Sequence, residues 1–483
     1  MHGKAPVAHK EIEVKLELAP GNLLALKKIP QLRTPQITPK RATEVSVYFD
    51  TDKHKLHKKG LILRVRRVGS RYVQTIKAGN NNVGPLERDE WEAELPGQEP
   101  DLNLAKDTAL EPLMTNKLRR RLKPLFETRV QRTVYPIVAN SHEIALTVDR
   151  GTIDTGTRAL PVCEIELELK RGPTAELFDL ARELAQALPA RLALKSKSER
   201  GYQLIDGKQE TPVRAAAIDL PADANARDAF KLISLACLKQ IIDNEAALIE
   251  GDPEGVHQMR VGMRRLRAAM FSILLHDPRT AAVKAELKWL AGELGPAREL
   301  EVLVQRVIVP IKRQRRRWRG MPSLSQEIAE RREDALKRAQ QAVRSARFRA
   351  LAFDVAAWLE AGHWRNPQDD LVRDQGNRYA TEFFSSLFTT KRAMKRRKQF
   401  LPTIERLQDG LGDLNDIAVH EKRITAIGIR RPRANSSRVF AAGLLTGRED
   451  ARMEAAMTAA TESRSGRFGA DKVQLILPAF DLR

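Results

Sequence analysis

The chain has 483 residues, of which 42% are apolar, so it has room for about two or three domains with hydrophobic cores and is not a disordered protein. Its formal net charge of +22 favours a polyanionic partner such as nucleic acid, polyphosphate or an anionic membrane surface. The two cysteines, Cys163 and Cys237, are too few for a disulfide scaffold or a cysteine-based zinc site.

The amino-terminal segment "MHGKAPVAHKEIEV" lacks the apolar core of a signal peptide. No uncharged apolar run approaches the roughly 18 residues of a membrane span. The low cysteine content fits a reducing compartment. We therefore expect a soluble cytoplasmic protein.

Two regions of different pattern follow one another along the chain. Up to about residue 205, polar and apolar residues mostly alternate in short runs separated by turns, which is typical of an antiparallel sheet or barrel, with helical patterns at about 20–29, 114–122 and 174–187. Residues 206–225 contain prolines and no period, which predicts a linker, and residues 226–460 show helical spacing. We predict the α+β class, with domains at 1–207 and 225–483 joined by a linker at 208–224.

Five of the predicted strands carry charged or polar side chains at alternate positions, opposite an apolar face. Successive side chains of a strand point to opposite faces, so each set shares one face. A solvated surface explains any one such strand, but five together indicate that the charged faces converge inside a closed sheet, where they must neutralise one another or a ligand. The positions are Glu11, Glu13, Lys15 and Glu17; Arg64 and Arg66; Thr75 and Lys77; Arg88, Glu90 and Glu92; and Glu164, Glu166 and Glu168.

Such an interior has an evident chemical use. Arginine and lysine donate hydrogen bonds to phosphate oxygens, whereas carboxylates hold Mg²⁺ or Mn²⁺, which in turn bridges phosphates. The combination is suited to phosphoryl chemistry on a linear polyphosphate.

Six motifs occur in a fixed order: "EIEVK", "LILRVRR", "TIK", "RDEWE", "VCEIELELK" and "LKSKSERGY". With these motifs, about residues 8–205 resemble the CYTH family, the triphosphate tunnel metalloenzymes. The resemblance implies an eight-stranded antiparallel β tunnel that binds a triphosphate end-on and hydrolyses it with Mg²⁺ or Mn²⁺. The long "EIELELK" strand and the helical region after it are more similar to the inorganic triphosphatase branch than to the thiamine triphosphatase or adenylate cyclase branches.

The resemblance also implies site residues. Our hypothesis is that a metal-bound water, positioned by the amino-terminal glutamates, attacks the terminal phosphorus, so that Glu11, Glu13 and Lys15 are catalytic. The phosphate-binding residues would be Lys15, Arg64, Arg66, Lys77, Arg129 and Lys195, the metal ligands Glu11, Glu13, Glu164 and Glu166, and the orienting residues Glu90 and Asp149. A structural role in salt bridges is equally compatible with Arg88, Glu92, Arg132, Glu168 and Lys197. No zinc site is expected at His54 and His57, because no third ligand is evident.

In the helical region, the segment "VHQMRVGMRRLRAAMFSILL" places Arg260, Arg264 and Arg267 in one stripe beside an apolar face. A solvated helix surface is the plain interpretation. However, no acidic residue occurs between 255 and 276, so these charges repel one another unless an anion lies across them.

A weak internal repeat relates "LAGELGPARELEVL" (290–303) to "LQDGLGDLNDIAVH" (407–420). It aligns Leu294 with Leu411, Gly295 with Gly412 and Glu299 with Asp416. The repeat predicts two related helical bundles that could enclose a groove with basic walls.

About residues 226–483 resemble the CHAD domain, a helical domain often fused to CYTH domains, through "VHQMRVGMRRLR" and "LGPARELEVL". The resemblance implies binding of inorganic polyphosphate by His257, Arg260, Arg264, Arg265, Arg267 and, in the second repeat, Arg378. The second repeat departs from the family pattern at Gln368, Leu371 and Gln375. Two basic clusters, at 312–319 and 391–398, are either solvated surface or further polyanion patches.

Both regions thus indicate a metal-dependent inorganic triphosphatase whose helical domain binds polyphosphate. Two alternatives remain: a hydrolase of an organic triphosphate such as thiamine triphosphate or ATP, and a non-catalytic polyphosphate-binding protein associated with polyphosphate granules. Nucleic acid is not the expected partner, because aromatic residues make up only 5% of the chain and do not interleave with the basic runs as stacking platforms would.

Overall fold

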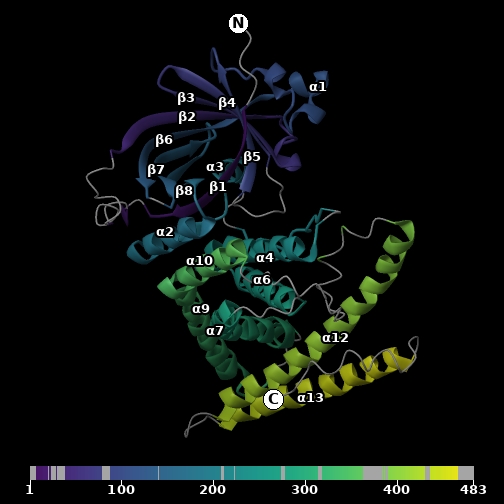
Figure 1. Cartoon of the computed structure of the whole chain (residues 1–483). Helices are drawn as coiled ribbons and strands as arrows, with labels where there is room; N and C mark the ends of the chain where they lie inside the picture. Colours follow the sequence, from purple (N-terminus) through teal and green to yellow (C-terminus); the bar gives the residue numbers. More distant parts are fainter. Residues whose placement is uncertain are drawn as a thin grey trace.

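The computed structural model has a sheet domain followed by a helical region (Figure 1). It describes residues 7–19, 21–22, 29, 38–78, 87–139, 141–207, 211–221, 224–272, 278–313, 318–362, 383, 386, 390–429 and 436–465. Most of the helix predicted at 20–29 lies outside these residues. The predicted phosphate contact Arg378 also lies outside them.

The sheet is antiparallel, which confirms the α+β prediction. Its nine strands follow the order β5-β4-β3-β2-β6-β7-β8-β1-β9, and β5 also pairs with β1 over Val7–Ile12. The sheet therefore curls until its first strand in this order is hydrogen-bonded to its eighth. The strands are β1 (Val7–Glu17), β2 (Lys40–Asp50), β3 (Leu61–Val68), β4 (Arg71–Ala78), β5 (Glu87–Leu95), β6 (Lys123–Val138), β7 (Glu143–Asp154), β8 (Ala159–Arg171) and β9 (Arg191–Ala193).

One strand exceeds the predicted eight. Strand β9 has three residues and pairs with Lys15–Glu17 of β1, so it extends the sheet beside the curled part. It is too short to give an alternating pattern in the sequence, which is why sequence periodicity did not reveal it.

The hydrophobic core of the sheet domain lies on the outer, convex side of the sheet. Helix α2 (Thr174–Ala187) buries Leu177 and Leu184 against the outward-facing Leu16 of β1 and Leu167 of β8. The same buried cluster continues into the helical region, where it includes Phe230. Because alternate residues of a strand face opposite sides, covering the apolar face of each strand turns its charged face inward.

The helical region packs below the sheet domain, with α2, α4 and α10 between the two, and α12 and α13 form a long hairpin at the far end (Figure 1). The described helices are α4 (Ala226–Asp243), α5 (Glu245–Ile249), α6 (Pro253–Ser272), α7 (Pro278–Leu303), a π-helix η6 (Val304–Ile308), α8 (Val309–Arg313), α9 (Met321–Arg344), α10 (Ala346–Ala361), α12 (Lys391–Ile429) and α13 (Ser436–Ser465).

The segment predicted to be a linker is anchored on the helical region. Within residues 211–221, which contain no helix or strand, Val213 exchanges two hydrogen bonds with the buried side chain of Asn244. Ile218 and Leu220 are also buried. Residues 211–221 are therefore packed against the helical region and do not form an extended, solvated linker.

No helix in the part of the chain that the structure describes combines the length and apolar content needed to cross a membrane.

Candidate active site

The charged faces of the strands meet at one cavity inside the curled sheet. Its volume is about 240 Å³, and seven basic and six acidic side chains line it. Three predicted phosphate-binding residues of β3 and β4, namely Arg64, Arg66 and Lys77, lie on its wall together with Lys15 of β1. The acidic side chains are Glu13, Glu44, Glu90, Glu92, Glu166 and Glu168.

Glu166 of β8 is the centre of an ionic cluster on one wall. Its carboxylate accepts hydrogen bonds of 3.0 Å from Lys15, 3.0 Å from Lys197 and 2.9 Å from Arg132. Burial would raise the pKa of this carboxyl, but the three cations hold the pKa well below its usual range. Glu166 is therefore ionised at neutral pH.

Arg132 of β6 is fixed by a bidentate pair with Asp149 of β7. The two hydrogen bonds measure 2.8 and 2.5 Å, and the Asp149 carboxylate is fully buried. Burial opposes the charge of Asp149, but Lys197 and Arg132 lower the pKa of its carboxyl. Asp149 therefore fixes the guanidinium of Arg132.

The opposite wall pairs basic residues with Glu90 and Glu44. Arg64 and Lys77 contact Glu90 at 3.3 and 3.0 Å, whereas Arg66 lies 3.6 Å from Glu44. Burial, followed by repulsion from Arg64, lowers the pKa of Arg66, and its buried Nε donates no hydrogen bond to a described residue. A phosphate oxygen would relieve both conditions.

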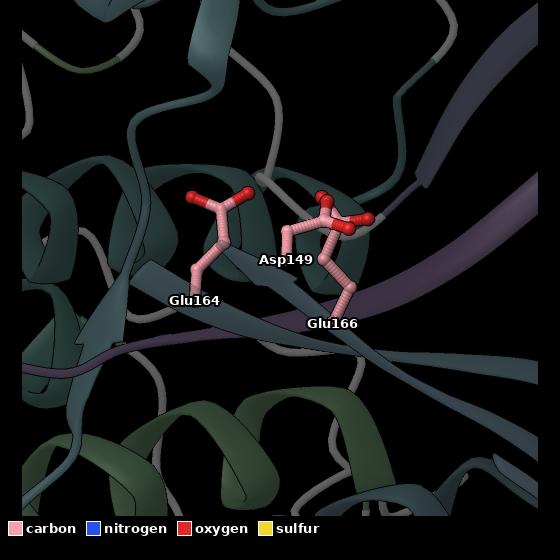
Figure 2. Close-up of side chains that lie close together, drawn as sticks. All are labelled: Asp149, Glu164 and Glu166. Carbon is pink, nitrogen blue, oxygen red and sulfur yellow. The ribbon is translucent and has the colours of Figure 1, made fainter. Parts of the chain in front are cut away.

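Three carboxylates beside the cavity lie close enough to share a cation. One oxygen from each of Asp149, Glu164 and Glu166 lies within 4.8 Å of the other two, and Figure 2 shows the three side chains extending to the same side of the sheet. Burial and the adjacent Glu166 raise the pKa of Glu164 in spite of Lys197. We call these three residues the carboxylate cluster.

The ammonium of Lys197 contacts all three members of the carboxylate cluster. Its Nζ lies 2.7 Å from Asp149 and 3.0 Å from Glu166, and it also contacts Glu164. An all-oxygen set of this kind fits Mg²⁺ or Mn²⁺. The buried Glu13 Oε1, which accepts no well-aligned hydrogen bond from a described residue, is a further oxygen donor nearby in the cavity wall.

The set of predicted metal ligands is thus only partly brought together. Glu164 and Glu166 belong to the carboxylate cluster with Asp149, which was predicted to orient basic side chains or a second ion. Glu13 instead contacts Lys15 at 2.5 Å. The side chain of Glu11 lies outside the described residues.

Arg129 was predicted to bind phosphate, and the structure contradicts this. Its side chain is 60% exposed and pairs with Glu127 on the outer face of β6. Arg132, three residues on, faces the opposite side of the strand and lines the cavity, as do Thr128 and Val130. Arg132 is therefore the described arginine of β6 that lines the cavity.

Lys195 is not among the residues that line the cavity, whereas Lys197 is. Strand β9 ends at Ala193, and Ser196 caps the helix α3 (Lys197–Ile205) with its side chain. The chain leaves the strand between these two lysines, so the alternation that would give them the same direction no longer holds. The cavity also has a segment that the sequence analysis did not assign, in which Glu44, Ser46 and Tyr48 alternate along β2.

In the helical region, Arg265 cannot contact a polyphosphate chain as predicted. It is only 2% exposed, donates to Gln240 at 2.9 Å, and lies 5.3 Å from the ring centre of Phe383. Arg264 and Arg267, on the other side of α6, are exposed.

His257, Arg260 and Arg264 form a basic face with Arg298 of α7, which was not singled out from the sequence. Burial, then the charge of Arg298, lowers the pKa of His257 to about 4. None of these three arginines lies within 4.0 Å of a described carboxylate. Among the residues that the structure describes, Glu299 and Glu254 act on Arg260 and Arg298 only from beyond ion-pair distance.

Comparison with known proteins identifies both regions. Residues 9–202 match the family model of the CYTH domain, and residues 233–377 match that of the CHAD domain. The chain therefore contains a CYTH domain followed by a CHAD domain, as the motifs predicted.

Among curated proteins, an inorganic triphosphatase of Haemophilus influenzae is 31% identical over 165 residues, which is 34% of this chain and 46% of that protein. The chain thus spans about half the length of this relative. Among solved structures, the CHAD domain of the plant Ricinus communis is 28% identical, covering 52% of this chain and 97% of that chain with a TM-score of 0.43. A putative adenylyl cyclase from Hippeastrum, described as having a dominant triphosphatase activity, is 21% identical, covering 41% and 97% with a TM-score of 0.32.

Proposed function

We propose that the chain hydrolyses inorganic triphosphate in the cavity of the CYTH domain, with Mg²⁺ or Mn²⁺ as cofactor. The observation that carries this proposal is the meeting of seven basic side chains with six acidic ones around one cavity of about 240 Å³. The similarity to an inorganic triphosphatase supports the same activity.

The basic side chains are suited to hold the phosphates. Arginine binds phosphate oxygens in pairs, and lysine supplies a compact charge. Each of these cations pairs with a carboxylate, so a triphosphate would compete for charges that are already ordered. The proposed phosphate-binding residues are Lys15, Arg64, Arg66, Lys77, Arg132 and Lys197.

The lining favours an inorganic substrate over an organic triphosphate. Ile62, Val130 and Tyr48 are its apolar or aromatic members, and the Tyr48 ring is stacked on Phe126 at 4.5 Å between ring centres. The remaining lining is charged or hydroxylic, so a base or thiamine ring would find little apolar surface there.

The carboxylate cluster, with Glu13 and Glu11 in the roles that the resemblance implies, would hold the metal. When bound, a divalent cation supplies Lewis acidity and lowers the pKa of a water molecule. The chain itself keeps Glu166 and Asp149 ionised at neutral pH, because Lys197 and Arg132 stabilise both negative charges. Lys15 holds Glu13 and Glu166 in place.

The CHAD domain is proposed to bind polyphosphate through the basic face of His257, Arg260, Arg264 and Arg298, with Arg267 beside it. The specific observation is that the three arginines of the face have no described carboxylate within ion-pair distance. A long phosphate chain needs such charge and no stacking platform. Association with polyphosphate granules in the cytoplasm would follow from this binding.

A substrate panel tests the proposal. Phosphate release by the full chain is measured with triphosphate, thiamine triphosphate and ATP at equal concentrations, with Mg²⁺, with Mn²⁺ and with a chelator. We expect turnover of triphosphate to exceed that of both organic substrates and to stop with the chelator. Faster turnover of an organic substrate would contradict the substrate assignment, and no turnover of any of them would contradict the enzyme assignment.

A further inference from the structure

Glu245, the first residue of α5, is a buried carboxylate of the CHAD domain whose ionic partner lies in the CYTH domain. Its side chain is 7% exposed, and its Oε1 lies 3.6 Å from Nη1 of Arg191 in β9. No other cation of the described chain lies within 4.0 Å of it. Burial disfavours the charge of this carboxylate, and Arg191 is the described group that offsets the penalty most, by its charge and by a hydrogen bond.

Arg191 begins an alternating series of charges that runs into the CYTH domain. Its Nη2 lies 3.3 Å from Oε2 of Glu17, its pairing partner in β1. The other oxygen of Glu17 lies 3.2 Å from Nη1 of Arg200 in α3, and Nη2 of Arg200 donates to Glu164 at 2.8 Å. We call Glu245, Arg191, Glu17, Arg200 and Glu164 the ion-pair chain.

Each inner member of the ion-pair chain uses one terminal atom for the neighbour on each side. Arg191 and Arg200 use their two Nη atoms in this way, and Glu17 uses its two carboxylate oxygens. Each of these planar groups is thus held from both sides, so its orientation depends on both neighbours. Glu17 and Arg191 are 36% and 38% exposed, so their contact adds little stability by itself. The ion-pair chain is better suited to orienting its members than to holding the domains together.

The ion-pair chain ends at the carboxylate cluster. Glu164 is 1% exposed, and its second oxygen contacts Lys197. Arg200 and Lys197 lie three residues apart on α3, so both basic groups that hold Glu164 come from one short helix. The orientation of the Glu164 carboxylate thus depends in part on Arg200, which the ion-pair chain connects to Glu245.

Resting on the proposed function, we propose that Glu245 of the CHAD domain is a positioning residue for the metal site of the CYTH domain. Through the ion-pair chain it fixes the orientation of Glu164 and so increases the affinity of the carboxylate cluster for divalent metal. The CHAD domain is then a structural part of the catalytic unit, whatever it binds on its basic face.

The test measures Mn²⁺ binding to the full chain by titration calorimetry, without substrate. Burial raises the pKa of Glu245 to about 7 in spite of Arg191, so the titration is done at pH 8, where its carboxylate is charged. We expect Glu245→Gln to weaken Mn²⁺ binding about fivefold, the lower end of usual coupling between sites. Wild-type affinity in this variant would overturn the proposal.

Asp354→Asn is the matched control. Asp354 of α10 pairs with Arg182 of α2 at 2.9 Å across the same domain boundary, but neither residue contacts the ion-pair chain or lines the cavity among the described residues. This variant should retain wild-type Mn²⁺ affinity. An equal loss of affinity in Asp354→Asn would show a general effect of the boundary and would count against the ion-pair chain.

A double-variant cycle separates transmission from a local effect. If Glu245 acts through Arg200, adding Glu245→Gln to Arg200→Gln should weaken Mn²⁺ binding no further, whereas additive losses would contradict the route. Should Glu245→Gln fail to fold, Arg191→Gln, which changes a partly exposed residue, takes its place with the same expected result. Mn²⁺ binding is measured without substrate, so it does not depend on turnover. Absence of triphosphatase activity in the wild type would refute the proposed function, but the Mn²⁺ titrations would still test the role of Glu245.

Discussion

Arg306 and Arg423 each lie three residues beyond a segment of the internal repeat, and each pairs with the acidic residue of the other segment. Arg306 lies 3.2 Å from Asp416, and Arg423 donates to Glu299 at 3.0 and 2.6 Å. The two arginines have the same sequence offset as Glu299 and Asp416. Such reciprocity is typical of related units packed about a local two-fold axis, and it links α7 and η6 to α12.

The reciprocal pairs give a first prediction. Arg423→Glu places two like charges together and should lower the unfolding temperature of the full chain by about 1–3 °C, a small effect because the pair is partly exposed. The charge-reversed double variant Arg423→Glu with Glu299→Arg should recover most of the loss in a thermal melt. A double variant no more stable than the single one would contradict the pairing.

Arg132 and Arg129 give a second prediction, because they lie on opposite faces of one strand. Arg132→Lys keeps the charge but loses the bidentate pair with Asp149, and we expect the KM for triphosphate to rise about tenfold. Arg129→Lys, a matched change on the outer face, should leave KM within about twofold. The KM values of the two variants, measured by steady-state kinetics, show which arginine binds triphosphate. A larger rise in KM for Arg129→Lys than for Arg132→Lys would support the original assignment of Arg129.

The opposite orientations of Arg129 and Arg132 illustrate what the sequence could and could not predict. Alternation predicted that Glu13, Lys15, Arg64, Arg66, Lys77 and Glu166 share one interior, because period two depends only on strand geometry. Within the 16-residue strand β6, charged residues occur on both faces, so alternation alone does not tell which face is inner. That information comes from the register of β6 with β2 and β7.

Other features depend on tertiary contacts that leave no periodic signal. Lys197 replaces Lys195 because Ser196 starts a helix between them. Glu245 and Arg191 meet only because the two domains pack together. Arg265 looks like Arg264 and Arg267 in the sequence, yet it is buried against Gln240.

His257 gives a third prediction, which concerns pH. Its pKa of about 4 lies below the usual 6.5, so between these values the unfolded chain binds a proton that the folded chain does not. This residue therefore makes the fold less stable as pH falls from about 6.5 to 4, and His257→Gln should flatten that part of the stability profile in denaturant titrations. An unchanged profile would contradict the low pKa.

Polyphosphate should reverse this shift, because a bound anion favours the imidazolium form beside Arg260, Arg264 and Arg298. We expect the pKa of His257, followed by NMR, to rise by about one unit or more when long-chain polyphosphate is added. An unchanged pKa at saturating polyphosphate would show that the chain does not lie across the basic face.

Arg264 and Arg265 give a fourth prediction, since neighbouring arginines have different surroundings. Arg264→Gln should weaken polyphosphate binding about threefold to tenfold without changing the unfolding temperature, because the side chain is exposed. Arg265→Gln should instead lower the unfolding temperature by several degrees, because it removes a buried cation from Gln240 and Phe383. Binding and melting curves of both variants test the assignment, and a thermally neutral Arg265→Gln would contradict it.

Glu166 provides the most direct test of whether the ionic cavity of the CYTH domain is the site of triphosphate hydrolysis. Glu127→Gln is the matched control, since Glu127 pairs with Arg129 on the outer face of β6, away from the cavity. The decisive measurement is phosphate release from triphosphate by the full chain with Mg²⁺ or Mn²⁺. We expect Glu166→Gln to lower kcat/KM by about 100-fold or more, whereas Glu127→Gln should stay within a few-fold of the wild type. Wild-type turnover by a folded Glu166→Gln variant would contradict the assignment of the cavity as the active site.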